Sequence, residues 1–336
     1  MMLNKIETIL IVGLGSIGKR HASIINEFFP LVKVVALRHS GCKKTDLDMF
    51  GLYDCVTSIE EAIAYKPQAA IISNPASKHI EAAIKLAEVG VNLLIEKPIS
   101  DSVKGVKELI KLCHQNNCIL MVAYNLRFLP SLIEFKEQIK SNKIGNMLSI
   151  RSEVGQYLPS WRPELDYRDS VSANKDLGGG VLLELSHDID YISWIFGPIK
   201  WVQSYISKQS SLEIDVEDFA NILLGFDNNE LTASLNMDFF RHDTTRKCFA
   251  IGEKGTLMWD GVNNEVKYFA KGERNWEIIF SSNIDKNYTY LKEIKSLFSA
   301  VEAQSSSSIN GNDAMQVVVA IEAIKRSSEI STKIYL

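Results

Sequence analysis

The chain is poor in cysteine, has no run of like charges and contains no long apolar segment. Its five cysteines form no CxxC pair and leave an odd one over, which argues against a disulfide framework or a structural zinc site. We therefore expect reduced thiols and no bound metal. No stretch reaches the roughly 20 apolar residues of a membrane helix, and the first residues do not resemble a signal peptide. These absences predict a cytoplasmic protein with no membrane partner.

The charge and the length narrow the class of protein further. A net charge of −4 without a basic stripe argues against nucleic acid as a partner. At 336 residues the chain exceeds one ordinary domain, so two hydrophobic cores are expected. The change of pattern along the chain predicts a first domain over 1–125 and a second over 126–336.

A glycine-rich turn follows the first apolar run, in "TILIVGLGSIGKRHASII". Gly13, Gly15 and Gly18 have G-x-G-x-x-G spacing between a β-type run and a helical segment. In this spacing the first glycine makes a tight turn, the second lets the backbone approach a pyrophosphate, and the third allows close packing of helix on strand. The helix that begins with Ser16 and Ile17 presents N–H groups to the phosphates. The segment therefore predicts a dinucleotide-binding site.

The residue that ends the second apolar run bears on which dinucleotide binds. NAD-preferring sites usually have Asp or Glu there, whose carboxylate binds the ribose 2′-hydroxyl. This chain has Arg38 instead, with Ser40 close behind. A guanidinium can bind a 2′-phosphate in a fork, so the sequence favours NADP(H), with NAD(H) as the alternative. The plainer interpretation is that Arg38 only borders the sheet.

Two kinds of hydrophobic pattern predict the fold class. The apolar runs 69–73, 91–95 and 118–123 alternate with helical segments, which is typical of parallel strands covered on both faces. The first domain should therefore be a Rossmann doubly wound parallel sheet. Beyond about residue 145 the pattern has period two, as in 231–240, which predicts an α+β domain with an open, mainly antiparallel sheet. The half-polar face of that sheet would suit a homo-oligomer.

Four segments in order, "GLGSIGKRHA", "SNPASKH", "EKP" and "GGGVLLELSHDID", resemble the glucose–fructose oxidoreductase and inositol dehydrogenase family, Gfo/Idh/MocA. The resemblance covers most of the chain, and the EKP motif is its most specific part. It implies an NAD(P)-dependent oxidoreductase acting on sugars, cyclitols or sugar derivatives. It also implies a second domain whose sheet joins subunits.

The resemblance places Lys97 of the EKP motif beside the nicotinamide and the reacting hydroxyl. The residue type agrees, because a lysine at the carboxyl end of a strand can donate to the substrate oxygen and stabilise alkoxide character. Glu96 would orient Lys97, while Asn74 and Pro75 would line the nicotinamide. His79 matches a family position in the next helix, where capping or packing is the alternative role. For Lys97 the alternative is an exposed lysine in a proline turn.

The apolar segment 178–197 carries four ionisable residues: Glu184, His187, Asp188 and Asp190. If one helix runs through it, Glu184, His187 and Asp188 share a face. His187 would then exchange the proton of the substrate hydroxyl, with Glu184 as its acid partner. The family usually has its acid four residues before the histidine, whereas Glu184 is three before, so the acid assignment stays open. The two aspartates are expected to be structural, and a structural His187 is the alternative.

The segment 155–180 is long for a connection and rich in aromatic and basic residues. Loops of this length are usually functional or disordered, and aromatic side chains argue against disorder. Aromatic faces stack on sugar rings or bases, and arginines can hold a carboxylate or phosphate. We predict a substrate-covering segment, with a domain-packing strap as the alternative. The substrate-binding candidates here and at the domain boundary are Asn125, Arg127, Tyr157, Trp161, Arg162 and Arg168.

Together these features predict an NADP(H)-preferring oxidoreductase that interconverts a secondary alcohol and a ketone on a sugar, cyclitol or nucleotide-sugar-like substrate. Two alternatives remain: an imine or tetrapyrrole reductase on the same fold, and a non-catalytic regulator that senses a sugar or cofactor. The presence of both Lys97 and His187 favours an enzyme, because a sensor needs neither.

Overall fold

A computed structural model describes residues 6–227, 231–305, 307 and 309–336. The chain divides into two compact units, Met1–Asn125 with Lys286–Val318 and Leu126–Asp285 with Val319–Leu336. The predicted division at residue 125 did not assign 286–318 to the first unit. This segment belongs there because helix α9 (Tyr288–Ala303) contacts helix α1 (Ser16–Phe28). Beside that contact the ring centroids of Phe29 and Phe298 lie 4.5 Å apart.

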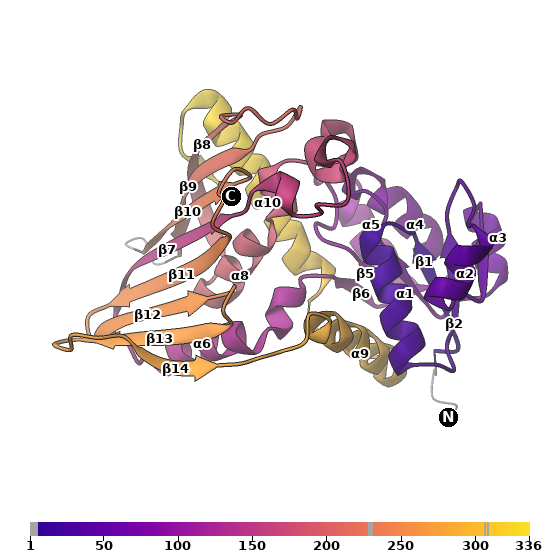
Figure 1. Ribbon diagram of the computed structural model, residues 1–336, viewed down its shortest axis with the longest axis horizontal. Helices are drawn as coiled ribbons and strands as arrows, with labels where there is room; N and C mark the ends of the chain where they lie inside the picture. Colours follow the sequence, from indigo (N-terminus) through magenta and orange to yellow (C-terminus); the bar gives the residue numbers. More distant parts are fainter. Residues whose placement is uncertain (1–5, 228–230, 306, 308) are drawn as a thin grey trace. The chain divides into compact units, whose positions relative to one another are not determined.

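A six-stranded parallel sheet forms the centre of the first unit, in the order β3-β2-β1-β4-β5-β6 (Figure 1). Strand β1 is buried at all five positions, as expected of a parallel strand covered on both faces. This order is that of a doubly wound dinucleotide-binding fold, which confirms the predicted fold class. The strands are Thr8–Val12 (β1), Lys33–Leu37 (β2), Asp54–Val56 (β3), Ala69–Ile72 (β4), Asn92–Ile95 (β5) and Leu120–Val122 (β6). The other helices are Lys44–Phe50 (α2), Ile59–Ala64 (α3), His79–Glu88 (α4), Val106–Gln115 (α5) and Gly311–Ile330 (α10), whose second half belongs to the second unit.

A nine-stranded sheet forms the second unit, in the order β14-β13-β12-β11-β7-β10-β9-β8-β15 (Figure 1). Among the described strands of this second sheet, only β7 and β10 pair in parallel. The prediction of a mainly antiparallel sheet is therefore confirmed. Its strands are Met147–Gly155 (β7), Ile199–Ser207 (β8), Phe219–Phe226 (β9), Thr232–Asp238 (β10), Thr245–Gly252 (β11), Gly255–Asp260 (β12), Glu265–Ala270 (β13), Glu277–Ser281 (β14) and Ile334–Tyr335 (β15). Its helices include Pro130–Lys140 (α6), Val181–Glu184 (α7) and His187–Phe196 (α8).

The two faces of this sheet differ. Helices α6 and α8 cover one face, where Trp259 Nε1 donates to Ser131 Oγ at 3.0 Å and the Trp259 and Tyr191 ring centroids lie 5.1 Å apart. On β9 and β10 the residues facing these helices are buried. The opposite face leaves Leu223 37% and Tyr205 60% exposed. Period-two patterning in the sequence thus corresponds to one packed face and one open face.

The expectation of reduced thiols throughout was wrong, because Cys42 and Cys55 form a disulfide. The pair is 13 residues apart in sequence, with Cys42 in the loop after β2 and Cys55 on β3, the neighbouring strand. Cysteine spacing alone does not indicate such a pairing. Cys113, Cys118 and Cys248 are free thiols.

None of the helices in the described ranges combines the length and the hydropathy needed to span a bilayer.

Candidate functional site

The predicted cofactor residues of the first unit and the predicted substrate residue Asn125 lie at the carboxyl edge of its sheet. Gly13 follows β1, Arg38 follows β2, Asn74 follows β4, Lys97 follows β5 and Asn125 follows β6. In parallel α/β sheets this edge is where ligands bind. The remaining cofactor candidates, Ser16, Ile17, Gly18, Ser40, Pro75, His79 and Glu96, lie on the loops and helix starts beside these positions.

The three motif glycines meet different surroundings, and each agrees with its expected role. Gly13 has φ +90°, and a Cβ there would lie 2.7 Å from the backbone N of Asn74. A Cβ on Gly18 would lie 2.1 Å from the carbonyl oxygen of Gly13, so close helix–strand packing requires glycine. A Cβ on Gly15 would meet nothing within 4 Å. The residues therefore fit a dinucleotide, because Gly15 borders open space at the start of α1 where a pyrophosphate approaches.

Replacing these glycines by alanine should separate ligand binding from folding. Gly15→Ala is expected to keep the unfolding free energy within about 1 kcal/mol of the parent, while weakening cofactor binding about tenfold or more. Gly18→Ala should instead lower stability by about 1–3 kcal/mol, because its Cβ overlaps a backbone oxygen. Denaturant unfolding and fluorescence titration with NADPH measure the two effects. Unchanged cofactor affinity in Gly15→Ala would contradict a pyrophosphate site at this loop.

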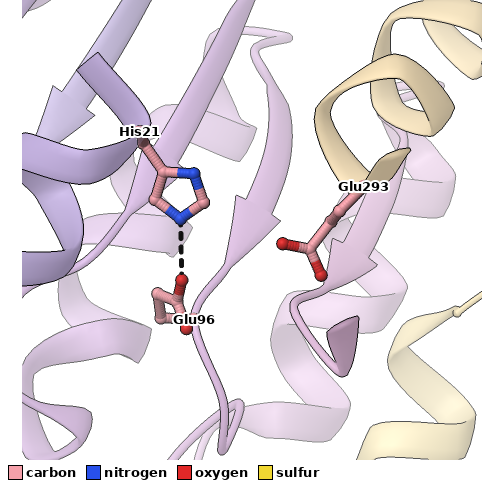
Figure 2. Close-up of side chains that lie close together, drawn as sticks. All are labelled: His21, Glu96 and Glu293. Carbon is pink, nitrogen blue, oxygen red and sulfur yellow. Dashed lines mark hydrogen bonds and ion pairs between the residues drawn. The ribbon is translucent and has the colours of Figure 1, made fainter. Parts of the chain in front are cut away.

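The carboxylate of Glu96 braces the start of the EKP segment. Glu96 is buried, and its Oε1 lies 2.7 Å from His21 Nε2 (Figure 2). Its Oε2 accepts from the backbone N of Lys97 at 3.3 Å. Lys97 itself is half-buried and precedes a cis peptide bond to Pro98. Glu96 therefore contacts the backbone of Lys97, the residue that it was predicted to orient.

His79 joins two loops of this edge. Its Nε2 lies 2.7 Å from the carbonyl oxygen of Asn74, and its Nδ1 lies 3.0 Å from that of Pro98. A neutral imidazole can donate to only one of these acceptors. Burial lowers the pKa of His79, although the two carbonyl oxygens favour its charged form. These contacts agree with packing, one of the alternative roles that the sequence suggested for His79.

An acidic residue that the sequence did not indicate lies beside Arg38. Asp46 on α2 has its carboxylate 3.5 Å from Arg38 Nη1 and 3.8 Å from Lys19 Nζ, and it accepts from the backbone N of Lys43. Ser40 is exposed in the same loop. The charge of Arg38 is thus already matched by a carboxylate. No local motif predicts this pair, because Asp46 belongs to a separate helix.

Asn125 is fixed by its own unit. Its Nδ2 donates to Thr289 Oγ1 at 3.1 Å, and the side chain is buried. This bond connects the end of the sheet edge to the start of α9.

In the second unit, the expectation of one helix through the acidic and histidine residues was wrong. Helix α7 ends at Glu184 and helix α8 begins at His187, with Leu185 and Ser186 between them. Gly180 precedes α7 with φ +103°, and a Cβ there would lie 2.5 Å from Glu217 Oε1. Glu184 and His187 are both half-buried. The relative position of the Glu184 and His187 side chains therefore does not follow from their spacing along a single helix.

The two aspartates after His187 have ion-pair partners, as their predicted structural role requires. Asp188 is fully buried and lies 3.1 Å from Arg246 Nη2. Asp190 accepts from Arg127 Nε at 3.0 Å and from Arg127 Nη2 at 2.7 Å. The Arg127 side chain is only 8% exposed, so this predicted substrate residue lies in a buried pair. Removing one partner of such a pair typically costs about 3–5 kcal/mol.

The predicted substrate-covering segment is ordered by short turns, at Leu158–Ser160, Tyr167–Asp169, Val171–Ala173 and Lys175–Leu177. The Tyr157 ring lies 4.5 Å from the His242 ring, and the Trp161 ring lies 5.3 Å from Phe239, between centroids. Arg162 is exposed. Arg168, within the turn Tyr167–Asp169, contacts the carboxylates of Asp166 and Glu213, which raise its pKa. Its charge is therefore already balanced within the unit.

Both halves of the chain match known families. Residues 8–124 match the oxidoreductase family with an NAD-binding Rossmann fold, and residues 132–258 match the GFO/IDH/MocA C-terminal domain. The chain belongs to the GFO/IDH/MocA family. The family model of the first half describes an oxidoreductase family with an NAD-binding Rossmann fold, as the resemblance of the motifs had implied.

Several similar proteins of this family carry names of enzymes for sugars or cyclitols. Levoglucosan dehydrogenase of Pseudarthrobacter phenanthrenivorans is 28% identical over 59% of this chain, and the match spans about half (53%) of that protein's length. Myo-inositol 2-dehydrogenase of Thermotoga maritima is 23% identical over 95% of both chains. A solved levoglucosan dehydrogenase in complex with NADH and levoglucosan has a TM-score of 0.86, with 20% identity over 98% of both chains. This structural likeness shows a shared fold.

Proposed function

We propose that this protein interconverts a secondary alcohol and a ketone on a sugar, cyclitol or nucleotide-sugar-like substrate, with NADP(H) favoured as cofactor. The observation that carries the proposal is the sheet edge on which Lys97 follows β5 and the glycine loop follows β1, two strands separated only by β4. A cofactor on the glycine loop and a substrate donor on Lys97 thus belong to one edge. The names of the relatives support a polyhydroxylated ring as substrate.

The proposed chemistry gives each catalytic candidate a separate role. Gly13, Gly15 and Gly18 would hold the dinucleotide, and its nicotinamide would supply or accept the hydride. The Lys97 ammonium donates a hydrogen bond to the substrate oxygen and stabilises the negative charge that develops there. His187 takes the hydroxyl proton in oxidation and returns it in reduction. Glu96 keeps the backbone of Lys97 in place through its contact with the Lys97 N–H.

The charge of the substrate follows from the arginines of the covering segment. Because Arg168 is paired with two carboxylates and Arg127 with one, a neutral sugar or cyclitol is a better candidate within this class than a sugar acid or a nucleotide sugar. A thermal-shift screen of sugars, cyclitols, sugar acids and nucleotide sugars with NADPH present tests this, because a ligand of the native state raises the midpoint. Hits are then assayed for oxidation or reduction by nicotinamide absorbance. Stabilisation by sugar acids alone would contradict a neutral substrate.

The residues around Asp46 support the preference for NADP(H). Arg38 stands where NAD-preferring sites have an acid, and Lys19 and Lys43 flank the same carboxylate of Asp46. A 2′-phosphate would replace the Asp46 carboxylate as the anion held between Arg38 and Lys19. Asp46 therefore competes with the phosphate, and its removal should favour NADP(H) further.

Variants of this pair should change the ratio of NADPH to NADH affinity. Arg38→Ala is expected to weaken NADPH binding about 10-fold to 100-fold, the loss of one charge-assisted contact, and to leave NADH affinity nearly unchanged. Asp46→Asn should tighten NADPH binding severalfold without tightening NADH binding. Fluorescence titration of both cofactors gives the dissociation constants. Asp48→Asn, an exposed residue of the same helix, is the control and should change neither. Tighter binding of NADH than of NADPH by the parent protein would contradict the preference.

We also propose that the open face of the second sheet joins copies of the chain into a homo-oligomer. Leu223→Lys places a charge on that face and should lower the molar mass measured by light scattering after gel filtration. Leu31→Lys, at an 84% exposed position of the first unit, is the matched control. A parent protein that is monomeric at assay concentration would contradict this assembly.

A cytoplasmic location stays a prediction. The Cys42–Cys55 disulfide argues against a location in a strongly reducing compartment, where such bonds are rare.

A further inference from the structure

Three side chains of metal-ligand type meet inside the first unit. His21 comes from α1, Glu96 from the end of β5 and Glu293 from α9 (Figure 2). One ligand atom from each lies within 4.8 Å of the others. His21 and Glu293 are fully buried and Glu96 is 8% exposed. In Figure 2 the carboxylate of Glu293 points toward the His21–Glu96 pair.

Glu293 is the feature that the fold does not explain. Both of its carboxylate oxygens are buried, and neither has a hydrogen-bond partner among the described residues. The neighbouring Glu96 already accepts from His21 and from the backbone of Lys97. A buried carboxylate without a partner costs several kcal/mol, and a second carboxylate beside it adds repulsion. Either a proton on Glu293 or a cation between the two acids must therefore neutralise the site.

We propose that His21, Glu96 and Glu293 bind one divalent cation of the zinc or manganese type. One imidazole nitrogen and two carboxylate oxygens form a ligand set common to such ions, and two carboxylates balance a charge of +2. Metal–ligand bonds of about 2.0–2.1 Å in a tetrahedral site put the ligand atoms about 3.3 Å apart. The distance from His21 Nε2 to Glu96 Oε1 is 2.7 Å, and the others are at most 4.8 Å. Side-chain shifts on the order of 1 Å would complete the site.

The bound cation would connect segments that are far apart in sequence. It would join α1, which begins at the glycine loop, to the end of β5 and to α9. Glu96 would then brace Lys97 with one oxygen and bind the metal with the other. The cation is structural and takes no part in hydride transfer. The inference stands independently of the proposed substrate and cofactor preference, and it departs from the expectation of no bound metal because its ligands include no cysteine.

Metal content and thermal stability of the full chain test the site. Protein treated with a chelator is dialysed, loaded with Zn²⁺ or Mn²⁺ and passed through gel filtration, and its metal is then measured by mass spectrometry. The parent is expected to retain about one ion per chain and to melt at a higher temperature when loaded. Glu293→Gln keeps the shape of the side chain but should lose both effects. Glu302→Gln, an exposed residue of the same helix, should behave as the parent does.

X-ray absorption of the zinc-loaded parent gives a second reading that needs no variant. Only nitrogen and oxygen ligands, with one imidazole, are expected. Sulfur in the coordination shell would assign the ion to a free cysteine such as Cys118 and overturn the proposal. Equal metal retention by the parent and Glu293→Gln would overturn it as well. So would the absence of both retention and thermal shift in the parent, which would leave a proton on Glu293 as the neutralising charge.

Discussion

Lys97→Met is expected to lower kcat about 10²-fold to 10⁴-fold while the protein still binds its nicotinamide cofactor. Methionine keeps most of the side-chain volume but removes the donor to the substrate oxygen. Loss of one donor to a developing oxyanion typically costs about 10²-fold to 10³-fold, and loss of its charge adds to this. The contact of Glu96 with the backbone of Lys97 is unaffected by the substitution. Steady-state kinetics and fluorescence titration with NADPH separate the two effects.

Lys104→Met is the control for this experiment. Lys104 is exposed and lies shortly after Lys97 in the same unit. Its loss should leave both kcat and cofactor affinity within about twofold of the parent. If Lys97→Met keeps full turnover, the EKP lysine has no catalytic role. If it loses cofactor binding and turnover together, the lysine holds the cofactor and the proposed role at the substrate oxygen is wrong.

His187→Asn is expected to lower kcat by a similar factor, about 10²-fold to 10⁴-fold, through loss of proton transfer. Asparagine can hydrogen-bond but does not titrate, whereas histidine changes charge between about pH 5 and pH 8. In the oxidation direction the base must be deprotonated. The parent should therefore lose kcat/KM as pH falls through the pKa of that base, and His187→Asn should lack this acidic limb.

The pH profile distinguishes catalysis from packing. If His187 were only structural, its replacement by Asn would lower stability or activity by the same factor at every pH. His114→Asn, at an exposed histidine of the first unit, should keep both the rate and the acidic limb. An unchanged profile in His187→Asn would assign proton transfer to another group.

Local sequence patterns were sufficient where chemistry depends on consecutive residues. The spacing of Gly13, Gly15 and Gly18 predicted a strand, a tight turn and a helix, and the structure gives Gly13 and Gly18 a steric reason to be glycine, while Gly15 borders open space. The carboxyl-edge position of Lys97 followed from the apolar run before it. Both rest on short-range geometry, which the order of the strands then brings to one edge.

Pairs that depend on tertiary contacts were not predictable. Asp46 meets Arg38 from a different helix, and Glu293 meets Glu96 from the other end of the chain. Cys42 and Cys55 meet because two strands are neighbours. In each case no fixed spacing connects the partners. The sequence identified the residue types near the site but not their counter-charges.

The segment with His187 shows a different kind of failure. Its apolar periodicity suggested one helix, yet the chain breaks it between Glu184 and His187. Asp188 then pairs with Arg246 on β11, and Asp190 pairs with Arg127 in the turn before α6. Buried ion pairs thus account for the two aspartates. The periodicity of helical faces carried no information about these partners.

Turnover by a Lys97→Met, His187→Asn double variant tests the central claim most directly, when it is measured in the same sample as NADPH affinity. The account predicts cofactor affinity close to that of the parent, with turnover as low as that of the slower single variant. Substitutions of groups that act in the same catalytic step have strongly non-additive effects on the rate. The second substitution should therefore lower turnover little further. Full turnover with the cofactor bound would contradict the account, because oxidoreductase chemistry at this site would then need neither residue.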